Sequence, residues 1–490
     1  MRLTDQRMYE RMLASDATCN GRFITGVLTT GIYCLPGCRA RKPKPENVRF
    51  FPTCEAARAA GLRPCRKCHP DDFARGADPV LADIEALVAE VRANPAAFAD
   101  TRALVRRSGF GTTRLFELVR QHFHLSPADL LLRARLDHAR SSLLAGTGSA
   151  APAGGRGSRR SAAPAGLLEV AAAAGFESLS VFHDHFRRAT GMTPAAYREL
   201  KQSRSFQVDL PDGYPLAYLK RSLARDPHRV TERQVGERYD FALRLAGQPA
   251  RLSLQFAERA VEATVEGGDA VEAHRVVVGL LGLEQDAAGF VRLAGRLGLG
   301  RLVRGREQLR VSQTPSIYDG LLWAIIGQQI NLAFAFQLRR RLYTLTGDPV
   351  GDGLIAPPTP AAVAALADDA LLPHQYSARK AEYVLRTSRL IASGELDLAG
   401  LRTSSVTRAE RTLLAVRGLG PWSVNYLLMR SLGAPDCVPL GDTGVTRALQ
   451  ALFKLEERPG VDATLRLMQP FSPYRSLATY HLWQFGRPAP

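Results

Sequence analysis

Four cysteines in two close pairs carry the first recognisable chemistry of this sequence. Cys34 and Cys38 are separated by three residues, Cys65 and Cys68 by two, and 26 residues lie between the pairs. Such spacing is typical of tetrahedral zinc sites that four thiolates close. Four thiolates around one divalent ion carry a net charge of about −2, which makes at least one sulfur strongly nucleophilic. The pattern predicts zinc, either as a structural staple or beside a sulfur that accepts an alkyl group.

A second candidate site lies near the other end of the chain, at Gly418-Leu419-Gly420. This turn separates two helical segments, RAERTLLAV and PWSVNYLLMR, and Asp442 follows Gly420 by 22 residues. Backbone N–H groups at the start of a helix bind phosphate, and the helix dipole favours the same anion. Glycine also ends many helices for steric reasons, so the turn alone is weak evidence. The carboxylate downstream favours a site that grips a DNA backbone and performs chemistry beside it.

The composition favours a polyanionic partner. The chain has 490 residues, a formal net charge of +18 and a pI near 10.0. We therefore expect several domains, and nucleic acid rather than a membrane surface as the partner. The apolar runs fall short of the ~20 residues that a membrane-spanning helix needs, and the first residues lack an apolar signal core. A bacterial cytoplasmic, nucleoid-associated protein with reduced or metal-bound cysteines is expected.

Changes in composition and periodicity divide the chain into four parts. Residues 1–76 hold six of the seven cysteines, and residues 80–202 have a helical period. Residues 205–305 begin with the alternating segments YDFALRLA, ARLSLQF and AVEATVEG, which predict half-buried strands. Residues 306–490 return to helical periods with short Gly and Pro breaks. Residues 146–166 are too rich in Gly, Ala, Pro and Ser to hold a core, so we expect a disordered insertion there.

An internal near-repeat in the second part predicts two helix-turn-helix units. Gly109 begins one copy, which continues as FGTTRLFELVRQHFHLSP, and Gly175 begins the other, FESLSVFHDHFRRATGMTP. Each glycine occupies a tight turn that needs unusual backbone angles. We expect recognition helices at residues 112–123 and 179–188. The phenylalanines of the repeat are interpreted as core residues: Phe110, Phe116, Phe176, Phe182 and Phe186.

The segments around the cysteines, TTGIYCLPGCRARKPKPENVRFF and GLRPCRKCHP, resemble the N-terminal domain of the bacterial Ada family, which removes methyl groups from alkylated DNA phosphates. The resemblance implies that Cys34 accepts the methyl group and that all four paired cysteines hold zinc. Methylating one thiolate would lower the negative charge of the site and strengthen DNA binding. Cys19 and Cys54 are interpreted as isolated thiols. The residues that the resemblance brings near the DNA backbone are Thr30, Arg39, Arg41 and Arg63.

The repeat itself resembles the AraC-type DNA-binding domain, with GFESLSVFHDHFRRATGMTPAAYR the better match. In that arrangement the two recognition helices would read successive major-groove faces of double-stranded DNA. A solvated basic helix face is the alternative interpretation of their charges. RNA polymerase is a further partner expected of a transcription activator. The candidate DNA contacts on these helices are Arg114, Arg120, Ser180, Arg187 and Arg188.

The last two parts, from about residue 205 to the end, resemble the AlkA-type 3-methyladenine glycosylases of the helix-hairpin-helix superfamily. The segments that carry this resemblance are SIYDGLLWAIIGQQINLAFAFQL, RGLGPWSVNYLLMR, CVPLGDTGVTRAL and PYRSLATYHLW. It implies that Gly418 and Gly420 contact the DNA backbone and that Asp442 stabilises an oxocarbenium-like sugar. The nearest other carboxylate, Asp436, is interpreted as a solvated loop residue. Aromatic rings attract an extruded cationic base, and the implied pocket consists of Trp422, Tyr426 and Trp483.

Two absent features limit the reactions expected of the last part of the chain, and one polar residue leaves a DNA-contacting role open. Trp422 stands where bifunctional relatives carry a Schiff-base lysine, so strand cleavage is not expected. Only Cys437 occurs in the last part of the chain, so no iron–sulfur cluster is expected. Gln329 falls where some relatives insert an apolar wedge into the duplex, and its polarity leaves that role open.

We therefore expect a multidomain α+β fold. Its four parts are a small zinc-bound α/β module, an all-α AraC-type double helix-turn-helix, a mixed α/β AlkA N-terminal-like subdomain and an all-α helix-hairpin-helix glycosylase domain. The expected protein is a monomer that excises alkylated purines and responds to DNA methylation. The alternative is a methylation-responsive transcription regulator whose glycosylase half only binds DNA. A further alternative makes the zinc purely structural.

Overall fold

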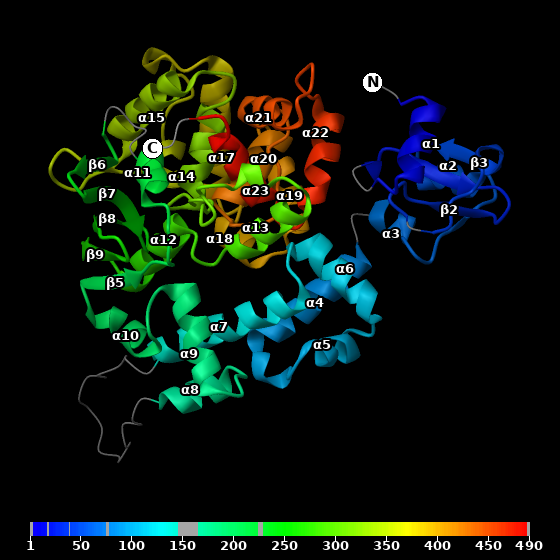
Figure 1. Ribbon diagram of the computed structural model, residues 1–490. Coiled ribbons are helices and arrows are strands. Elements are labelled where there is room, and N and C mark those ends of the chain that lie inside the picture. Colours follow the sequence, from blue (N-terminus) through cyan, green and yellow to red (C-terminus); the bar gives the residue numbers. More distant parts are fainter. Residues whose placement is uncertain are drawn as a thin grey trace, which may run out of the picture. The chain divides into compact units, whose positions relative to one another are not determined.

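The computed structural model describes residues 3–16, 19–38, 40–74, 78–145, 165–223 and 229–487 (Figure 1). The chain forms two compact units, Met1–Val88 and Ala89–Pro490. The predicted insertion at residues 146–166 lies outside the described residues, except for its last two positions. Within the described residues, no helix combines the length and apolarity that crossing a bilayer demands.

The first unit is built on a four-stranded sheet with the order β3-β1-β2-β4. Its strands are β1 (Ile24–Val27), β2 (Ile32–Cys34), β3 (Val48–Phe51) and β4 (Arg63–Pro64). The helices are α1 (Asp5–Leu13), α2 (Cys54–Ala59) and α3 (Pro70–Ala74), and α4 (Pro79–Ala93) continues into the second unit. Gly26 on β1 is required by packing, because a Cβ there would lie 2.6 Å from the side chains of Leu62 and Phe51.

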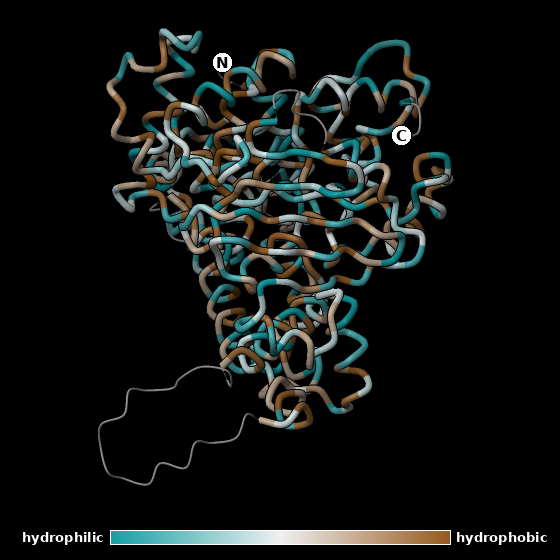
Figure 2. Tube along the Cα trace, turned by 90° about the vertical axis from the view of Figure 1, so that its left-hand side faces the viewer, coloured by the Kyte–Doolittle hydropathy of each residue, from teal (hydrophilic) through white to brown (hydrophobic). Residues whose placement is uncertain are grey.

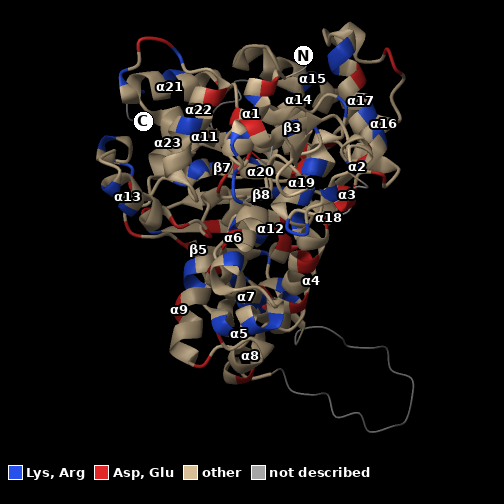
Figure 3. Ribbon diagram, turned by 90° about the vertical axis from the view of Figure 1, so that its right-hand side faces the viewer, with Lys and Arg blue, Asp and Glu red and all other residues tan. Residues whose placement is uncertain are grey.

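Helices dominate the start of the second unit. They are α5 (Thr101–Ser108), α6 (Thr112–Phe123), α7 (Pro127–Ala145), α8 (Leu167–Ala173), α9 (Leu179–Thr190) and α10 (Pro194–Arg198). The predicted recognition helices are α6 and α9, and α9 extends two residues beyond its predicted end. Gly109 and Gly175 have φ values of +69° and +87°, as the predicted turns require. Three arginines lie on α5, which Figure 3 shows with blue segments.

A five-stranded antiparallel sheet follows, with the order β5-β9-β8-β7-β6. Its strands are β5 (Ser205–Asp209), β6 (Glu232–Val235), β7 (Arg238–Leu245), β8 (Gln248–Phe256) and β9 (Ala260–Glu266). Figure 2 shows teal and brown alternating along these strands, as expected when one face is buried. The three predicted strands are confirmed as β7, β8 and β9. The periodicity missed β5 and β6, which are only five and four residues long.

The second helix-turn-helix unit and this sheet share one hydrophobic core. Buried residues of α7, α8 and α9 pack in the same cluster as the inward side chains of the sheet and of α12 (Ala270–Leu281). Nε2 of His274 on α12 donates a hydrogen bond to the carbonyl of Thr190 at 2.8 Å, and Arg140 on α7 forms an ion pair with Glu284 at 2.7 Å. The predicted AraC-like part is therefore joined to the sheet by a common core.

The rest of the second unit is mainly helical. Helix α11 (Leu216–Leu223) lies between β5 and β6 in the sequence, and α13 (Ala287–Arg296) follows α12. Strand β10 (Asp348–Pro349) pairs with β11 (Ile355–Ala356). The remaining helices are α14 (Ile317–Ile326), α15 (Leu332–Thr346), α16 (Pro360–Ala364), α17 (Ala378–Ala392), α18 (Leu398–Thr403), α19 (Val406–Leu414), α20 (Pro421–Arg430), α21 (Thr443–Phe453), α22 (Val461–Met468) and α23 (Arg475–Gln484). They enclose one large apolar core.

Buried histidines make the second unit sensitive to acid. Burial lowers the pKa of His124 and of His274 to about 4, and that of His481 to about 3. An unfolded chain binds these protons near pH 6.5, whereas the folded chain excludes them. The histidines therefore contribute stability above pH ~6.5 that is lost as the pH falls towards about 4. We expect the thermal unfolding midpoint to fall across this range, and to fall less in His274→Gln. An equal fall in both proteins would contradict this assignment.

Candidate active site and metal centre

The four paired cysteines converge in the first unit. Their sulfur atoms all lie within 4.8 Å of one another, and three of the four residues are buried. The backbone N–H of Leu35 donates to Sγ of Cys68, and that of Lys67 donates to Sγ of Cys65, each at 3.4 Å. Backbone donors of this kind stabilise thiolates, the form in which cysteine binds metal. A tight cluster of sulfurs with backbone donors therefore fits one zinc ion.

The sheet positions the two halves of this cluster. Cys34 ends β2, and the short strand β4 runs parallel to β2 immediately before Cys65. The N–H of Cys65 donates to the carbonyl of Tyr33 at 3.0 Å, which holds the second pair against the first. The sequence spacing alone could not bring the pairs together, because 26 residues separate them.

The expected DNA contacts of the first unit lie at its surface. Thr30, Arg41 and Arg63 are exposed, and the N–H of Arg63 bonds to the carbonyl of Gly31 at 2.9 Å, so Arg63 and Thr30 lie near each other on adjoining segments. Arg39 lies outside the described residues. Cys19 and Cys54 are buried and do not belong to the sulfur cluster.

The glycine turn lies between α19 and α20. Gly418 has a φ of +100°, and a Cβ there would lie 2.5 Å from the ring of Tyr383, so no other residue fits without displacement. Gly420 is the N-cap of α20 and is exposed. The first N–H groups of α20 have no helical acceptor, and Pro421 removes one of them. This end of α20 is therefore open to a phosphate.

Asp442 is held by three N–H donors. It is the N-cap of α21, where its Oδ1 accepts from the N–H of Val445 at 2.9 Å. The indole Nε1 of Trp483 donates to Oδ1 at 3.0 Å, and that of Trp422 donates to Oδ2 at 3.2 Å. Hydrogen bonds to both oxygens fix the orientation of the carboxylate. A partly exposed, oriented carboxylate can stabilise a cation that develops in front of it.

Aromatic rings line one side of this carboxylate. Trp422 stacks on Tyr426 with centroids 5.4 Å apart and planes at 19°, and the Tyr426 and Trp483 rings lie 6.3 Å apart. Arg430, one turn after Tyr426 on α20, lies 5.8 Å from the Tyr426 and Tyr480 ring centres. The three predicted aromatics and Asp442 thus form one cluster. Tyr480 and Arg430 extend it, and the sequence interpretation missed both because it considered the motif residues only.

The structure corrects the interpretation of Asp436 as a solvated residue. It is buried with 6% of its surface exposed, rather than a solvated loop residue. Arg475 forms a two-point ion pair with it at 2.7 and 2.9 Å, and Ser472 donates to it at 2.8 Å. Arg475 and these donors hold the pKa of Asp436 below its usual range, although burial opposes them. Asp436 is therefore a structural ion-pair partner that joins α23 to the loop before Asp442.

On the predicted recognition helices, the structure corrects the interpretation of Phe116 and gives two of the arginines carboxylate partners. Phe116 on α6 is 41% exposed and lies under the guanidinium of Arg120 at 5.3 Å, so it is not a core residue. Arg187 on α9 forms a two-point ion pair with Asp209 at 2.7 and 2.9 Å. Arg188 pairs with Asp184 at 2.9 Å, one turn earlier on the same helix. Both arginines remain exposed, but a DNA phosphate would have to compete with these carboxylates.

Helix α6, the first predicted recognition helix, packs on α19 of the hairpin. His122, near the end of α6, is buried, and its Nδ1 lies 3.0 Å from Oγ1 of Thr407 at the start of α19. Nδ1 of His124 lies 3.9 Å from Sγ of Cys437, in the loop before Asp442. The contact is made at the start of α19, the end away from Gly418.

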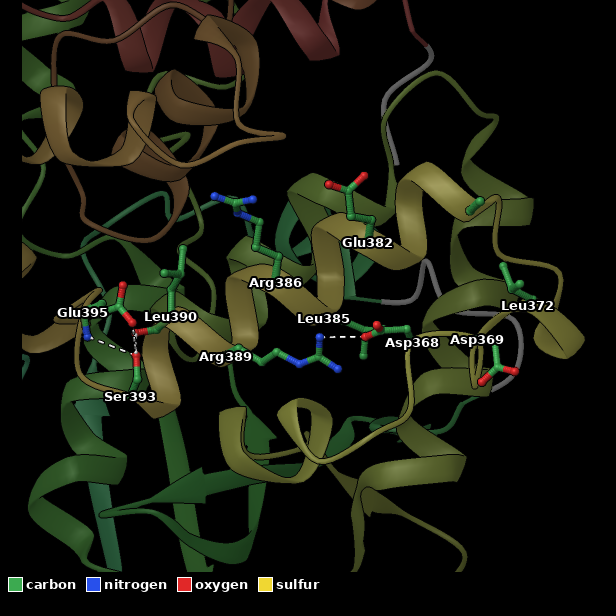
Figure 4. Close-up of a pocket in the computed structure, with 11 residues that line it drawn as sticks. Asp368, Asp369, Leu372, Glu382, Leu385, Arg386, Arg389, Leu390, Ser393 and Glu395 are labelled. Carbon is green, nitrogen blue, oxygen red and sulfur yellow. Dashed lines mark hydrogen bonds and ion pairs between the residues drawn. The ribbon is translucent and has the colours of Figure 1, made fainter.

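A surface hollow of about 660 Å³ lies beside α17 (Figure 4). Leu385 and Leu390 contribute apolar surface, and Arg389 forms an ion pair with Asp368 at 2.7 Å. None of the predicted site residues lines this hollow. The candidate active site is therefore the Asp442 cluster rather than this hollow.

Comparisons with known proteins agree with this architecture. Residues 7–71 match the model of the metal-binding domain of Ada. Residues 167–199 match the bacterial regulatory helix-turn-helix proteins of the AraC family, and residues 322–473 match the HhH-GPD superfamily of base excision DNA repair proteins. The Ada model and the sulfur cluster together assign one zinc ion to Cys34, Cys38, Cys65 and Cys68.

Individual relatives cover different parts of the chain. A DNA-3-methyladenine glycosylase of Bacillus subtilis is 35% identical over 206 residues, which are 41% of this chain and 68% of that protein. A probable bifunctional transcriptional activator/DNA repair enzyme AlkA of Mycobacterium tuberculosis is 28% identical over 98% of this chain and 96% of its own length. The solved 3-methyladenine DNA-glycosylase of Archaeoglobus fulgidus has a TM-score of 0.51 at 24% identity, over 58% of this chain and 98% of that chain, which shows a shared fold.

The glycine turn between α19 and α20, followed by a capping aspartate beside aromatic rings, defines a base-excision protein of the helix-hairpin-helix superfamily. Within that superfamily, the chain belongs to the DNA-3-methyladenine glycosylase family. It carries Ada-type metal-binding and AraC-type helix-turn-helix segments ahead of the glycosylase.

The indole donors to Asp442 can be tested with the three tryptophans of the chain. Trp483→Phe and Trp422→Phe each keep a ring but remove one N–H bond to the carboxylate. A hydrogen bond to a charged group contributes about 1.5–3 kcal/mol, so we expect a loss of roughly tenfold or more in the single-turnover rate of base release. Trp323→Phe is the matched control, because Trp323 packs on Phe336, whereas the indole bonds to Asp442 come from Trp422 and Trp483. Equal rates in all three variants would refute the role of the indoles.

Proposed function

We propose that the second unit excises alkylated purines of the 3-methyladenine type by hydrolysis and that Asp442 is its catalytic carboxylate. The observation that carries this proposal is the orientation of both Asp442 oxygens by two indoles and a helix N-terminus. As the glycosidic C–N bond breaks, its electron pair leaves with the base and positive charge develops on the sugar. The carboxylate stabilises this charge and orients the water that attacks the sugar carbon.

The aromatic cluster supports the choice of base. An extruded purine needs a stacking surface, and an N-alkylated purine carries positive charge that an electron-rich ring attracts. Trp422, Tyr426 and Trp483 supply such rings next to Asp442. The backbone of Gly418 and the N-terminus of α20 at Gly420 would hold the DNA strand, and the exposed Gln329 would face the duplex. Trp422 also occupies the place of a Schiff-base lysine, so the proposed reaction stops at base removal.

For the first unit, we propose that Cys34 accepts a methyl group from DNA methyl-phosphotriesters. Zinc supplies the chemistry of a stable thiolate at neutral pH when it is bound. The Cys34 sulfur attacks the methyl carbon, an S–C bond forms, the C–O bond breaks, and the electron pair stays on the phosphodiester oxygen. Thr30, Arg41 and Arg63 lie exposed at the same module and would contact the DNA backbone, with Arg39 the fourth proposed contact. The transfer is a single turnover because the methyl thioether that forms is stable and the thiolate is not regenerated.

The domain assignment follows from these roles. We assign residues 1–76 to the methyl acceptor, 80–202 to AraC-type DNA binding, 205–305 to the AlkA N-terminal-like subdomain and 306–490 to the glycosylase. Double-stranded DNA is the common partner of all parts. Exposed Arg187 and Arg188 on α9 would contact promoter DNA, and RNA polymerase is the proposed partner in activation. We further propose that the protein acts as a monomer at the bacterial nucleoid.

A methylation-responsive regulator whose glycosylase half only binds DNA is the second candidate function. The packing of α6 on α19 favours coupling between promoter binding and DNA binding by the glycosylase half, since it joins a predicted recognition helix to the hairpin. The ordered Asp442 favours an enzyme, because binding alone does not need an oriented carboxylate.

Asp442→Asn separates the two candidates. Asparagine keeps the size of the side chain and still caps a helix, so α21 should be retained. We expect release of free 3-methyladenine from methylated duplex DNA to fall at least about 100-fold, because the neutral amide cannot stabilise the sugar cation. Chromatography of released bases measures the rate, and fluorescence anisotropy on the same duplex checks that binding persists. Full activity in this variant would remove the catalytic assignment.

Cys34 is tested by the location of the transferred methyl group. After incubation with duplex DNA that carries methyl-phosphotriesters, peptide mass spectrometry should find one added methyl group on Cys34. Cys54→Ser, a buried cysteine outside the cluster, should transfer normally. Affinity for an unmodified duplex should rise after methylation, because the zinc site loses one negative charge. A methyl group on another cysteine would contradict the acceptor assignment, and no change in affinity would favour a purely structural zinc.

A further inference from the structure

The turn that carries Gln329 is held in an uncommon conformation. Gln329 has a φ of +55°, in the left-handed region that favours glycine, and its side chain is exposed. Such a residue persists when surrounding contacts determine its conformation. The turn follows α14 and precedes Asn331, which caps α15. Contacts with neighbouring elements are therefore expected to hold the turn in this conformation.

Lys380 provides the first of these contacts. Its Nζ donates to the carbonyls of Ile326, at 2.5 Å, and Gln328, at 3.0 Å. Ile326 is the last residue of α14, whose final carbonyls have no helical donor and attract a cation. Lys380 is partly buried, and this burial lowers its pKa. The ammonium thus joins the end of α14 to the residue that immediately precedes Gln329.

Gln328 provides the second contact. Its Nε2 donates to the carbonyl of Gly418 at 2.8 Å and to Oγ of Ser423 at 3.0 Å. Gly418 belongs to the glycine turn, and Ser423 is a buried residue of α20. The backbone that precedes Gln329 is therefore bonded directly to the hairpin.

Helix α17 sets the distance between these two elements. Lys380 and Tyr383 are three residues apart on α17 and so share a face of the helix. Lys380 holds the Gln329 turn, while the ring of Tyr383 fills the space beside Gly418. Glu382, between them, forms an ion pair with Arg417 at 3.1 Å. One helix therefore supports both the element proposed to hold the DNA backbone and the exposed side chain next to it.

We propose that Lys380 is a positioning residue for base extrusion: through the Ile326 and Gln328 carbonyls it holds Gln329 so that this side chain enters the duplex when the hairpin binds the backbone. The polar amide of Gln329 would then occupy the space that the extruded nucleotide leaves. The inference rests on the proposed glycosylase function. It assigns Lys380 no contact with the reacting atoms.

The test separates insertion from catalysis. The probe is a duplex with a tetrahydrofuran abasic-site analogue and a neighbouring 2-aminopurine, whose fluorescence rises when it is unstacked. We expect the unaltered protein to raise this fluorescence and Lys380→Met to lose most of the rise, while anisotropy shows binding within about threefold. Lys380→Arg should restore the signal, because a guanidinium can donate to the same two carbonyls. Lys454→Met, at an exposed lysine, is the matched control.

Release of 3-methyladenine from methylated duplex DNA gives the second measurement. We expect Lys380→Met to lower the single-turnover rate at saturating protein by tenfold or more. Gln329→Ala removes an exposed side chain without touching the core, so it should reproduce both losses even if Lys380→Met unfolds. A fluorescence rise in Lys380→Met or Gln329→Ala equal to that of the unaltered protein would overturn the inference. A rise that depends on Lys380 without any base release would support the inference and contradict the proposed function.

Discussion

The orientation of the Asp442 carboxylate is the constraint on which the rest of the glycosylase depends. Its two oxygens are bonded to the start of α21, to Trp422 on α20 and to Trp483 on α23. Three helices must therefore meet at one side chain. The buried ion pair of Asp436 with Arg475 secures α23 against the loop that precedes Asp442, and the hydrogen bond of Ser476 to the carbonyl of Ala434 adds to the same junction. The loop before Asp442 is therefore fixed at both ends of this junction.

The second constraint is the common core of the AraC-like helices and the five-stranded sheet. A sheet has an apolar face, which another layer of secondary structure must cover. Here α12 and helices of the second helix-turn-helix unit share in that cover, and His274 and Arg140 make polar bonds across the boundary. The first unit has only a small apolar core, formed largely by short strands, and the cluster of four cysteine sulfurs is the second centre that holds it together.

Much of the fold could be predicted from local signals. Alternation in YDFALRLA, ARLSLQF and AVEATVEG identified three strands, and burial alternates along β8 and β9, whereas β7 is buried on both faces. Helices α6 and α9 could be predicted from the repeat, because each copy begins with a turn glycine, and both glycines have a positive φ that other residues rarely adopt. Short strands such as β5 and β6 could not be predicted, because alternation over four or five residues is too short to be distinguished from chance. The predicted burial of Phe116 and of Asp436 was wrong for one reason. Residue type gives only the average burial of a side chain, whereas its actual environment depends on neighbours, here Arg120 beside Phe116 and Arg475 beside Asp436.

The sequence by itself determined the types of group available for chemistry: two pairs of cysteines, a glycine turn before a helix, one carboxylate downstream and three aromatic residues to surround it. Their local spacing also limited which of them could share a helix. Only the tertiary structure decided that both indoles donate to Asp442, that Arg187 faces Asp209, and that Lys380 and Tyr383 contact the end of α14 and Gly418. These contacts join residues on separate elements, and their distances depend on how the helices pack, which no local pattern specifies.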